Sequence, residues 1–253
     1  FDCVTGSPAV TMCIEQLGIA DKGAMILSQP RRLALVLLGL YWPGFFILAH
    51  IPIPMAVRRA GMSDKTLHVL AYMLLAFLLG TAASPDRRLS WRRVRSWLVL
   101  VGVIGYGAVD ELVQAKVGRT ADLHDFIADV VGCCIAMGVL TLLPFWRGFA
   151  VVTAATIFAL SNLTTANPAA SFPAINAVFH VLAYGLFTVV WSRNLPSCVL
   201  SRAVGLKAVA LRVSVPLALL VLTKASGRFL SRPLHAGETV LALVGIAATA
   251  LAL

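Results

Sequence analysis

The segment SDKTLHVLAYMLLAFLLG, Ser63–Gly80, begins with polar residues and continues as an apolar run. An acid, a base, a histidine and a tyrosine fall within its first ten residues, whereas the remainder is aliphatic or aromatic. An apolar stretch of about 20 residues spans the hydrocarbon of a bilayer as a helix. The segment therefore predicts a membrane helix whose first turns carry polar residues.

The composition of the whole chain agrees with a membrane location. Of the 253 residues, 59% are hydrophobic and 13% are charged, and the mean hydropathy is +0.88. Soluble domains contain only about 45 to 50% apolar residues. The net charge of +10 comes from basic residues between the apolar runs, where they orient helices and meet anionic lipid head groups. We therefore expect membrane lipids, and no nucleic acid, as partners.

Eight apolar runs are long enough to cross a bilayer as helices. We predict an all-α, polytopic membrane helix bundle with about eight transmembrane helices. The expected spans are 33–51, 66–83, 96–114, 123–145, 148–163, 175–192, 204–223 and 234–253.

The distribution of lysine and arginine predicts the orientation of these helices, because cytoplasmic loops retain positive charge. With the N-terminus inside, the inner segments hold eleven basic residues and the outer segments hold eight. The arginine-rich segment 87–95 accounts for much of the difference. We therefore expect both termini to be cytoplasmic.

The N-terminal residues differ from the rest of the chain. Residues 1–24 show weak periodicity and lack the basic and apolar regions of a signal peptide. Met25 opens MILSQPRRLALVLLGLYW, which has the form of a natural start followed by a first membrane helix. We therefore interpret residues 1–30 as an N-terminal tail and expect the part before Met25 not to be native.

The pentapeptide HVLAY occurs at His68–Tyr72 and again at His180–Tyr184, 112 residues later. Only five histidines and four tyrosines exist in the chain, so a chance match of both is improbable. An offset of 113 matches Arg119 with Arg232, Asp125 with Glu238 and Gly132 with Gly245. The sequence thus predicts a tandem duplication, with four-helix repeats at 31–146 and 147–253 that run parallel because four is even.

Unusual polar residues gather at the predicted start of the second helix, the end of the third and the start of the fourth. In the predicted topology these three ends lie on the outer side. A charge at the bilayer centre costs about 2.5 to 3.5 kcal/mol on insertion scales, so such residues face the bundle interior and find partners. The candidate ligand-binding residues of this pocket are Asp64, Lys65, His68, Tyr72, Glu111, Gln114, Arg119, Asp125 and Asp129.

Within this pocket, Lys65 and Arg119 are the expected partners of Glu111 and Asp125, while His68 and Tyr72 supply hydrogen bonds. The alternative is that the same residues only join helix ends at the membrane interface. Their concentration on one side of one repeat favours the pocket. Two other histidines receive simpler interpretations, His50 at the outer membrane interface and His124 as an exposed loop residue.

The second repeat lacks several of these polar residues, so we expect it to be functionally degenerate. Lys224 and Gly227 replace Glu111 and Gln114, and Asn176 and Ala177 replace Asp64 and Lys65.

The polar residues resemble the pattern of the VanZ-like family of small bacterial membrane proteins, a DK..H...Y segment followed by E..Q....R and D...N..G. The match covers roughly residues 33–145, and the remainder only as the weakened repeat. Asp129 departs from the pattern because the family usually has asparagine there. The corresponding residues are Asp64, Lys65, His68, Tyr72, Glu111, Gln114, Arg119, Asp125, Asp129 and Gly132.

The family takes its name from an association with low-level resistance to the glycopeptide teicoplanin. The resemblance therefore implies a bacterial cytoplasmic membrane and a link to the cell envelope. It implies no established reaction.

Three functions remain open. The first is binding of an amphiphilic or anionic envelope ligand, such as a lipid-linked glycan or a glycopeptide, with Lys65 and Arg119 meeting phosphate or carboxylate. The second is a hydrolase or transferase with Glu111 as general base, His68 as acid or metal ligand and Asp125 orienting. The third is a transporter. Because each half has a single such histidine and no HxxxH spacing, we predict no metal or other cofactor.

Overall fold

A computed structural model describes residues 28–50, 64–84, 88–116, 122–162, 173–196, 205–229 and 235–253. Within these ranges the chain forms eight α-helices and no strand. The predicted tail before Met25, together with Arg119 and Arg232, lies outside the described residues. The helices are α2 (Gln29–His50), α4 (Asp64–Ala83), α5 (Val94–Lys116), α6 (Leu123–Leu142), α7 (Phe145–Asn162), α9 (Pro173–Asn194), α11 (Leu206–Phe229) and α12 (Ala236–Ala252).

Five of these helices, α4, α5, α6, α9 and α11, are long and apolar enough to cross a membrane, and α12 is a shorter apolar helix. Large apolar side chains are exposed on their outer faces; on α5 these include Val94, Leu98, Val101 and Leu112. Such a surface suits lipid rather than water. The protein is therefore helical and has the character of a membrane protein.

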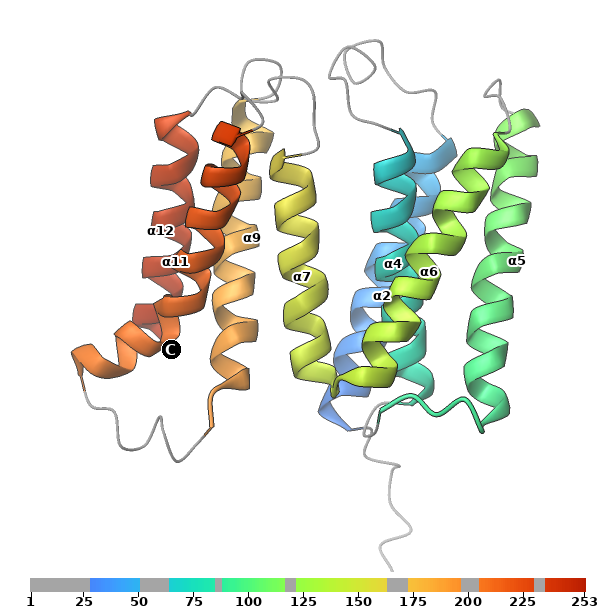
Figure 1. Cartoon of the computed structure of the whole chain (residues 1–253), viewed down its shortest axis with the longest axis horizontal. Coiled ribbons are helices and arrows are strands. Elements are labelled where there is room, and N and C mark those ends of the chain that lie inside the picture. Colours follow the sequence, from blue (N-terminus) through green and yellow to red (C-terminus); the bar gives the residue numbers. More distant parts are fainter. Residues whose placement is uncertain are drawn as a thin grey trace, which may run out of the picture.

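The helices form two groups of four that stand side by side (Figure 1). The first half, α2 to α6, and the second half, α7 to α12, each run alternately up and down (Figure 1). The start of α2 and the end of α12 consequently lie at the same end of the bundle.

The predicted spans overlap all eight helices, but the boundary between 123–145 and 148–163 was misplaced. α6 ends at Leu142, and α7 already begins at Phe145. Leu143 is extended, with φ −121° and ψ 145°, because the residue before a proline is sterically kept out of the helical region. Pro144 therefore separates the two helices at this point.

Close helix packing occurs at corresponding places in the two halves. A Cβ atom added to Gly132 on α6 would overlap the carbonyl oxygen of Val69 on α4, and one added to Gly245 on α12 would overlap that of Val181 on α9. Small residues let helix backbones approach closely, which is how membrane helices gain packing contacts. These two glycines therefore set the spacing of α4 against α6 and of α9 against α12.

The two halves meet through aromatic packing. Phe145 and Phe149 of α7 each stack on Phe77 of α4, with ring centroids 6.0 Å apart. All three belong to the hydrophobic core of the first half. α7 thus packs against the first half, and a second core lies around Tyr184, Phe187 and Ile246.

Candidate functional site

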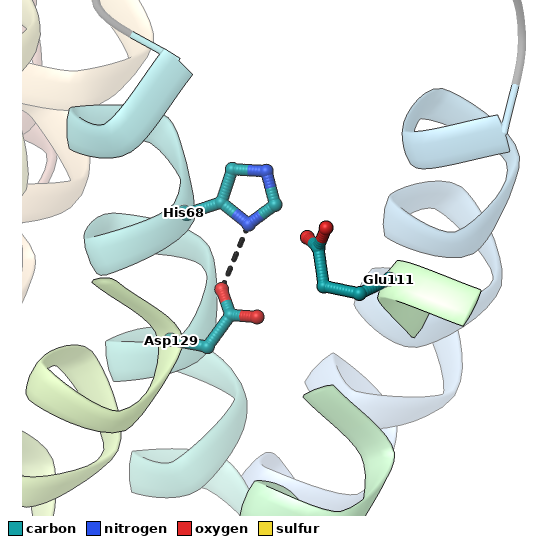
Figure 2. A group of neighbouring side chains, drawn as sticks. All are labelled: His68, Glu111 and Asp129. Carbon is teal, nitrogen blue, oxygen red and sulfur yellow. Dashed lines mark hydrogen bonds and ion pairs between the residues drawn. The ribbon is translucent and has the colours of Figure 1, made fainter. Parts of the chain in front are cut away.

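A buried histidine and two buried acids converge at one end of the first half. Nδ1 of His68 on α4 lies 2.8 Å from Oδ1 of Asp129 on α6, and Glu111 from α5 points toward this pair (Figure 2). One ligand atom from each of the three residues lies within 4.8 Å of the others. Their exposed fractions are 7%, 0% and 6% for His68, Asp129 and Glu111. We call these three residues, together with their polar neighbours Lys65, Asp110, Gln114, Asp122 and Asp125, the polar cluster.

Two glycines make room for the polar cluster. Gly132 allows α6 to approach α4 one turn below the His68–Asp129 pair. On α5, a Cβ at Gly107 would lie 3.1 Å from Oδ2 of Asp129 and 3.3 Å from Cε1 of Tyr72. A side chain at either position would displace the residues that carry the site.

Lys65 forms the rim of the cluster, one helical turn above His68. Its Nζ lies 3.2 Å from Oδ1 of Asp125 and 3.1 Å from Oδ2 of Asp122. Asp125 is itself one turn above Asp129 on α6. The parallel helices α4 and α6 therefore present two successive pairs, Lys65 with Asp125 at the rim and His68 with Asp129 deeper.

Asp122 joins α6 to Glu111. Its backbone N–H donates to Oε2 of Glu111 at 3.0 Å, and its side chain accepts from the N–H of His124 at the N-terminus of α6. Hydrogen bonds from the backbone and the ring of His124, and then from Lys65, hold the pKa of Asp122 below its usual value. The Asp122 carboxylate is therefore charged at neutral pH.

Asp110 and His50 belong to the same region and were not among the predicted site residues. Nε2 of Gln114 donates to Oδ2 of Asp110 at 2.8 Å, and Nε2 of His50 lies 3.6 Å from Oδ1 of Asp110. His50, which we expected at the outer membrane interface, is the last residue of α2, and its side chain is 11% exposed and faces a buried acid. The sequence does contain a signal for this part of the site, because Asp110 is a second acid beside Glu111 in an apolar run.

The predicted residues that the structure describes lie together, and Lys65 contacts Asp125 as expected. His68 supplies a hydrogen bond, also as expected, and its partner is Asp129. Among the predicted residues, Oε1 of Glu111 and Oδ2 of Asp129 are buried and have no hydrogen-bond partner in the described part of the chain. The side chain of Asp64 and the whole of Arg119 lie outside the described residues. As expected, His124 is exposed, although it lies in the first turn of α6.

In the second half, both carboxylate oxygens of Glu238, the residue matched with Asp125, have partners. Glu238 accepts from Nζ of Lys224 at 2.7 Å and from Nδ2 of Asn176 at 3.2 Å, and Nε2 of His180 lies 3.7 Å away. The Tyr184 hydroxyl bonds the Thr223 hydroxyl at 2.9 Å. His68 and His180 thus each lie near an acid, and Glu238 is also bonded to a lysine.

An apolar groove leads to the polar cluster. Its volume is about 560 Å³, and it is lined by α2, α4 and α7 and by Gln114 of α5. His68 and Gln114 are polar residues at its wall, while the remaining lining is mostly apolar and includes Gly44, Phe45, Leu67 and Leu74. A second cavity of about 800 Å³ shares Leu40, Tyr41, Leu74 and Thr156 with it and extends to Arg32 and Arg193. The two cavities together follow the junction of the halves.

In comparisons with known proteins, no family model matches the chain, and no curated protein and no solved structure matches it. Function is therefore inferred from the residues and their geometry.

The polar cluster is suited to two kinds of chemistry. A histidine hydrogen-bonded to a carboxylate can hold or transfer a proton. One imidazole nitrogen with two carboxylate oxygens can also hold a metal ion. Both need side chains that lie close together, and one ligand atom from each of the three residues lies within 4.8 Å of the others.

Proposed function

We propose that the protein binds an amphiphilic ligand of the bacterial cell envelope, with the apolar tail in the groove and the polar head group at the polar cluster. The observation that carries this proposal is the groove of about 560 Å³ that reaches His68 and Gln114. Ligand sites are mostly apolar, with a few polar groups that fix orientation. A groove of this shape and lining suits an acyl chain.

In this proposal the chain is a multi-pass, VanZ-like protein of the cytoplasmic membrane, built from parallel four-helix repeats at 31–146 and 147–253. Arg88, Arg92, Arg93 and Arg95 lie around the start of α5, at the end of the bundle opposite the polar cluster (Figure 1). Because basic residues remain in the cytoplasm, the polar cluster would face outward and both termini would be cytoplasmic.

The head group is better matched by hydroxyl and amide groups than by a free anion. Asp110, Glu111 and Asp129 bring three buried acids to the cluster, and in the described part of the chain Lys65 is already paired with Asp122 and Asp125. A sugar can donate to carboxylates, whereas a phosphate would be repelled. An acylated glycopeptide such as teicoplanin, or a glycolipid without phosphate, combines such a head group with an acyl tail.

Filling the groove should weaken binding of an acylated ligand. Gly44 lines the groove and has open space where a Cβ would lie, so Gly44→Phe is expected to reduce teicoplanin affinity at least tenfold, about 1.4 kcal/mol. Titration of the purified protein in nanodiscs, with teicoplanin and with a glycopeptide that lacks an acyl chain, measures the effect.

Gly39→Phe is the matched control. Gly39 is exposed on the same helix and also has open space at its Cβ position, so its substitution should leave binding unchanged. Equal loss in both variants, or equal affinity for the acylated and the non-acylated glycopeptide, would contradict the proposal. The deletion strain, compared under envelope-active antibiotics with its lipid-linked intermediates measured, provides the cellular test.

The second candidate is an acid/base hydrolase or transferase that acts on a lipid-linked substrate. It is favoured by Glu111, whose buried carboxylate faces the His68–Asp129 pair; here Asp129, rather than Asp125, would orient His68. Glu111→Gln separates the two candidates. If this substitution abolishes the cellular phenotype while ligand binding and protein level are retained, catalysis is favoured over binding alone.

A further inference from the structure

We propose that His68, Glu111 and Asp129 form a binding site for one divalent transition-metal ion. Each residue offers one ligand atom, and the three atoms already lie within 4.8 Å of one another. Ligands at about 2.0 to 2.2 Å from a tetrahedral Zn²⁺ are about 3.3 Å apart. The site therefore needs only a modest closure of side chains that already face one another (Figure 2).

Glu111 is the side chain that can make this closure. Its Oε2 accepts the backbone N–H of Asp122, whereas its Oε1 is buried and has no hydrogen-bond partner among the described residues. Oδ2 of Asp129 is also buried and has no hydrogen-bond partner among the described residues. Buried carboxylate oxygens without a donor are costly, and a cation placed between them removes that cost.

The excess of buried acids in the polar cluster also favours a bound cation. Asp110, Glu111 and Asp129 are buried close together, and burying like charges without a counter-ion is unfavourable. His68 already contacts Asp129, and Lys65 contacts the more exposed pair of acids at the rim. The described residues thus leave the centre of the cluster with more acids than bases.

Comparison with the second half also supports a cation at this site. At the 113-residue offset, Lys224 stands where the first half has Glu111, and Ala242 stands where it has Asp129. Nζ of Lys224 lies 2.7 Å from Oε2 of Glu238, close to His180. In the second half, the ammonium group of Lys224 therefore supplies a positive charge beside Glu238 and His180. The first half has the carboxylate of Glu111 at the matching position. The proposed metal site does not depend on the amphiphilic ligand.

The ligand set selects the class of metal. Mg²⁺ and Ca²⁺ prefer oxygen ligands alone, whereas an imidazole nitrogen combined with carboxylates suits Zn²⁺, Mn²⁺ or Co²⁺. We therefore expect Zn²⁺ and Co²⁺ to bind and Ca²⁺ not to compete.

The test is titration of the chelator-stripped, full-length protein in detergent with Zn²⁺ and Co²⁺. We expect one ion per chain, a rise in the thermal unfolding midpoint on Zn²⁺ addition, and Co²⁺ absorption bands typical of nitrogen and oxygen ligands. Glu111→Lys copies the second half and should abolish binding. Asp129→Asn keeps the shape of the side chain and should weaken binding at least tenfold, so it serves if Glu111→Lys does not fold.

Glu238→Gln is the matched control in the second half and should leave the stoichiometry and affinity unchanged. The proposal would be overturned if the stripped wild-type protein binds no Zn²⁺ or Co²⁺. It would also be overturned if folded Glu111→Lys or Asp129→Asn binds as the wild type does, because the ion would then be held elsewhere.

Discussion

Replacing Gly132 with valine is expected to lower the free energy of unfolding by about 3 kcal/mol or more. A Cβ at this position would overlap the carbonyl oxygen of Val69 and lie 2.9 Å from the amide nitrogen of Met73. Both are backbone atoms in the middle of α4, so no side-chain rotation relieves the clash. Helix α6 must therefore move away from α4, which also separates His68 from Asp129. Denaturation in mixed detergent micelles measures the loss.

Gly138→Val provides the control on the same helix. Gly138 has nothing within 4 Å of its Cβ position, so the substitution should change the free energy of unfolding by no more than about 0.5 kcal/mol. Gly245→Val, the corresponding change in the second half, should be as damaging as Gly132→Val because it meets the Val181 carbonyl. Equal stability of the Gly132 and Gly138 variants would show that α4 and α6 are not closely packed.

The helices could be predicted from sequence because lipid leaves few alternatives. Any segment that crosses a bilayer must satisfy its own backbone hydrogen bonds, so a sufficiently long apolar run becomes a helix. The ends were harder to predict, as Leu143 and Pro144 show. Hydrophobicity continues through both residues, and only the steric effect of proline on its predecessor separates α6 from α7.

The close contacts of Gly132 and Gly107 could not be predicted in the same way. A glycine in an apolar helix can have open space at its Cβ position, as Gly138 does, or lie against another backbone, as Gly132 does. Hydropathy does not distinguish these cases. Only the matching of Gly132 with Gly245 across the two halves indicated that the position has a specific role.

The members of the polar cluster could be predicted because acids and histidines are rare in membrane helices. The acid that pairs with His68 could not be predicted, since Asp125 and Asp129 are four residues apart and share one face of the helix. The depth of α6 relative to α4 decides which acid meets His68. Lys65 takes Asp125 at the rim, and His68 takes Asp129 one turn below.

Replacing His68 with leucine is the second change for which we expect a large effect. It leaves the carboxylate of Asp129 buried without its 2.8 Å contact, and removing one partner of a buried ionic pair costs about 3 to 5 kcal/mol. His180→Leu should cost less, because Glu238 keeps its contacts with Lys224 and Asn176. Unfolding of both variants in the presence of a chelator compares the two halves directly. A loss for His180→Leu as large as that for His68→Leu would contradict this expectation.

The most direct test of the central claim, that His68 and Asp129 form one buried unit, is a double-mutant cycle with His68→Leu and Asp129→Leu. Replacing both members of a buried polar pair by apolar residues is far less harmful than removing one. We therefore predict that the double variant is more stable than His68→Leu alone, with a coupling free energy of about 2 kcal/mol or more. Losses that add within about 0.5 kcal/mol would mean that the two side chains are independent, and would contradict the account.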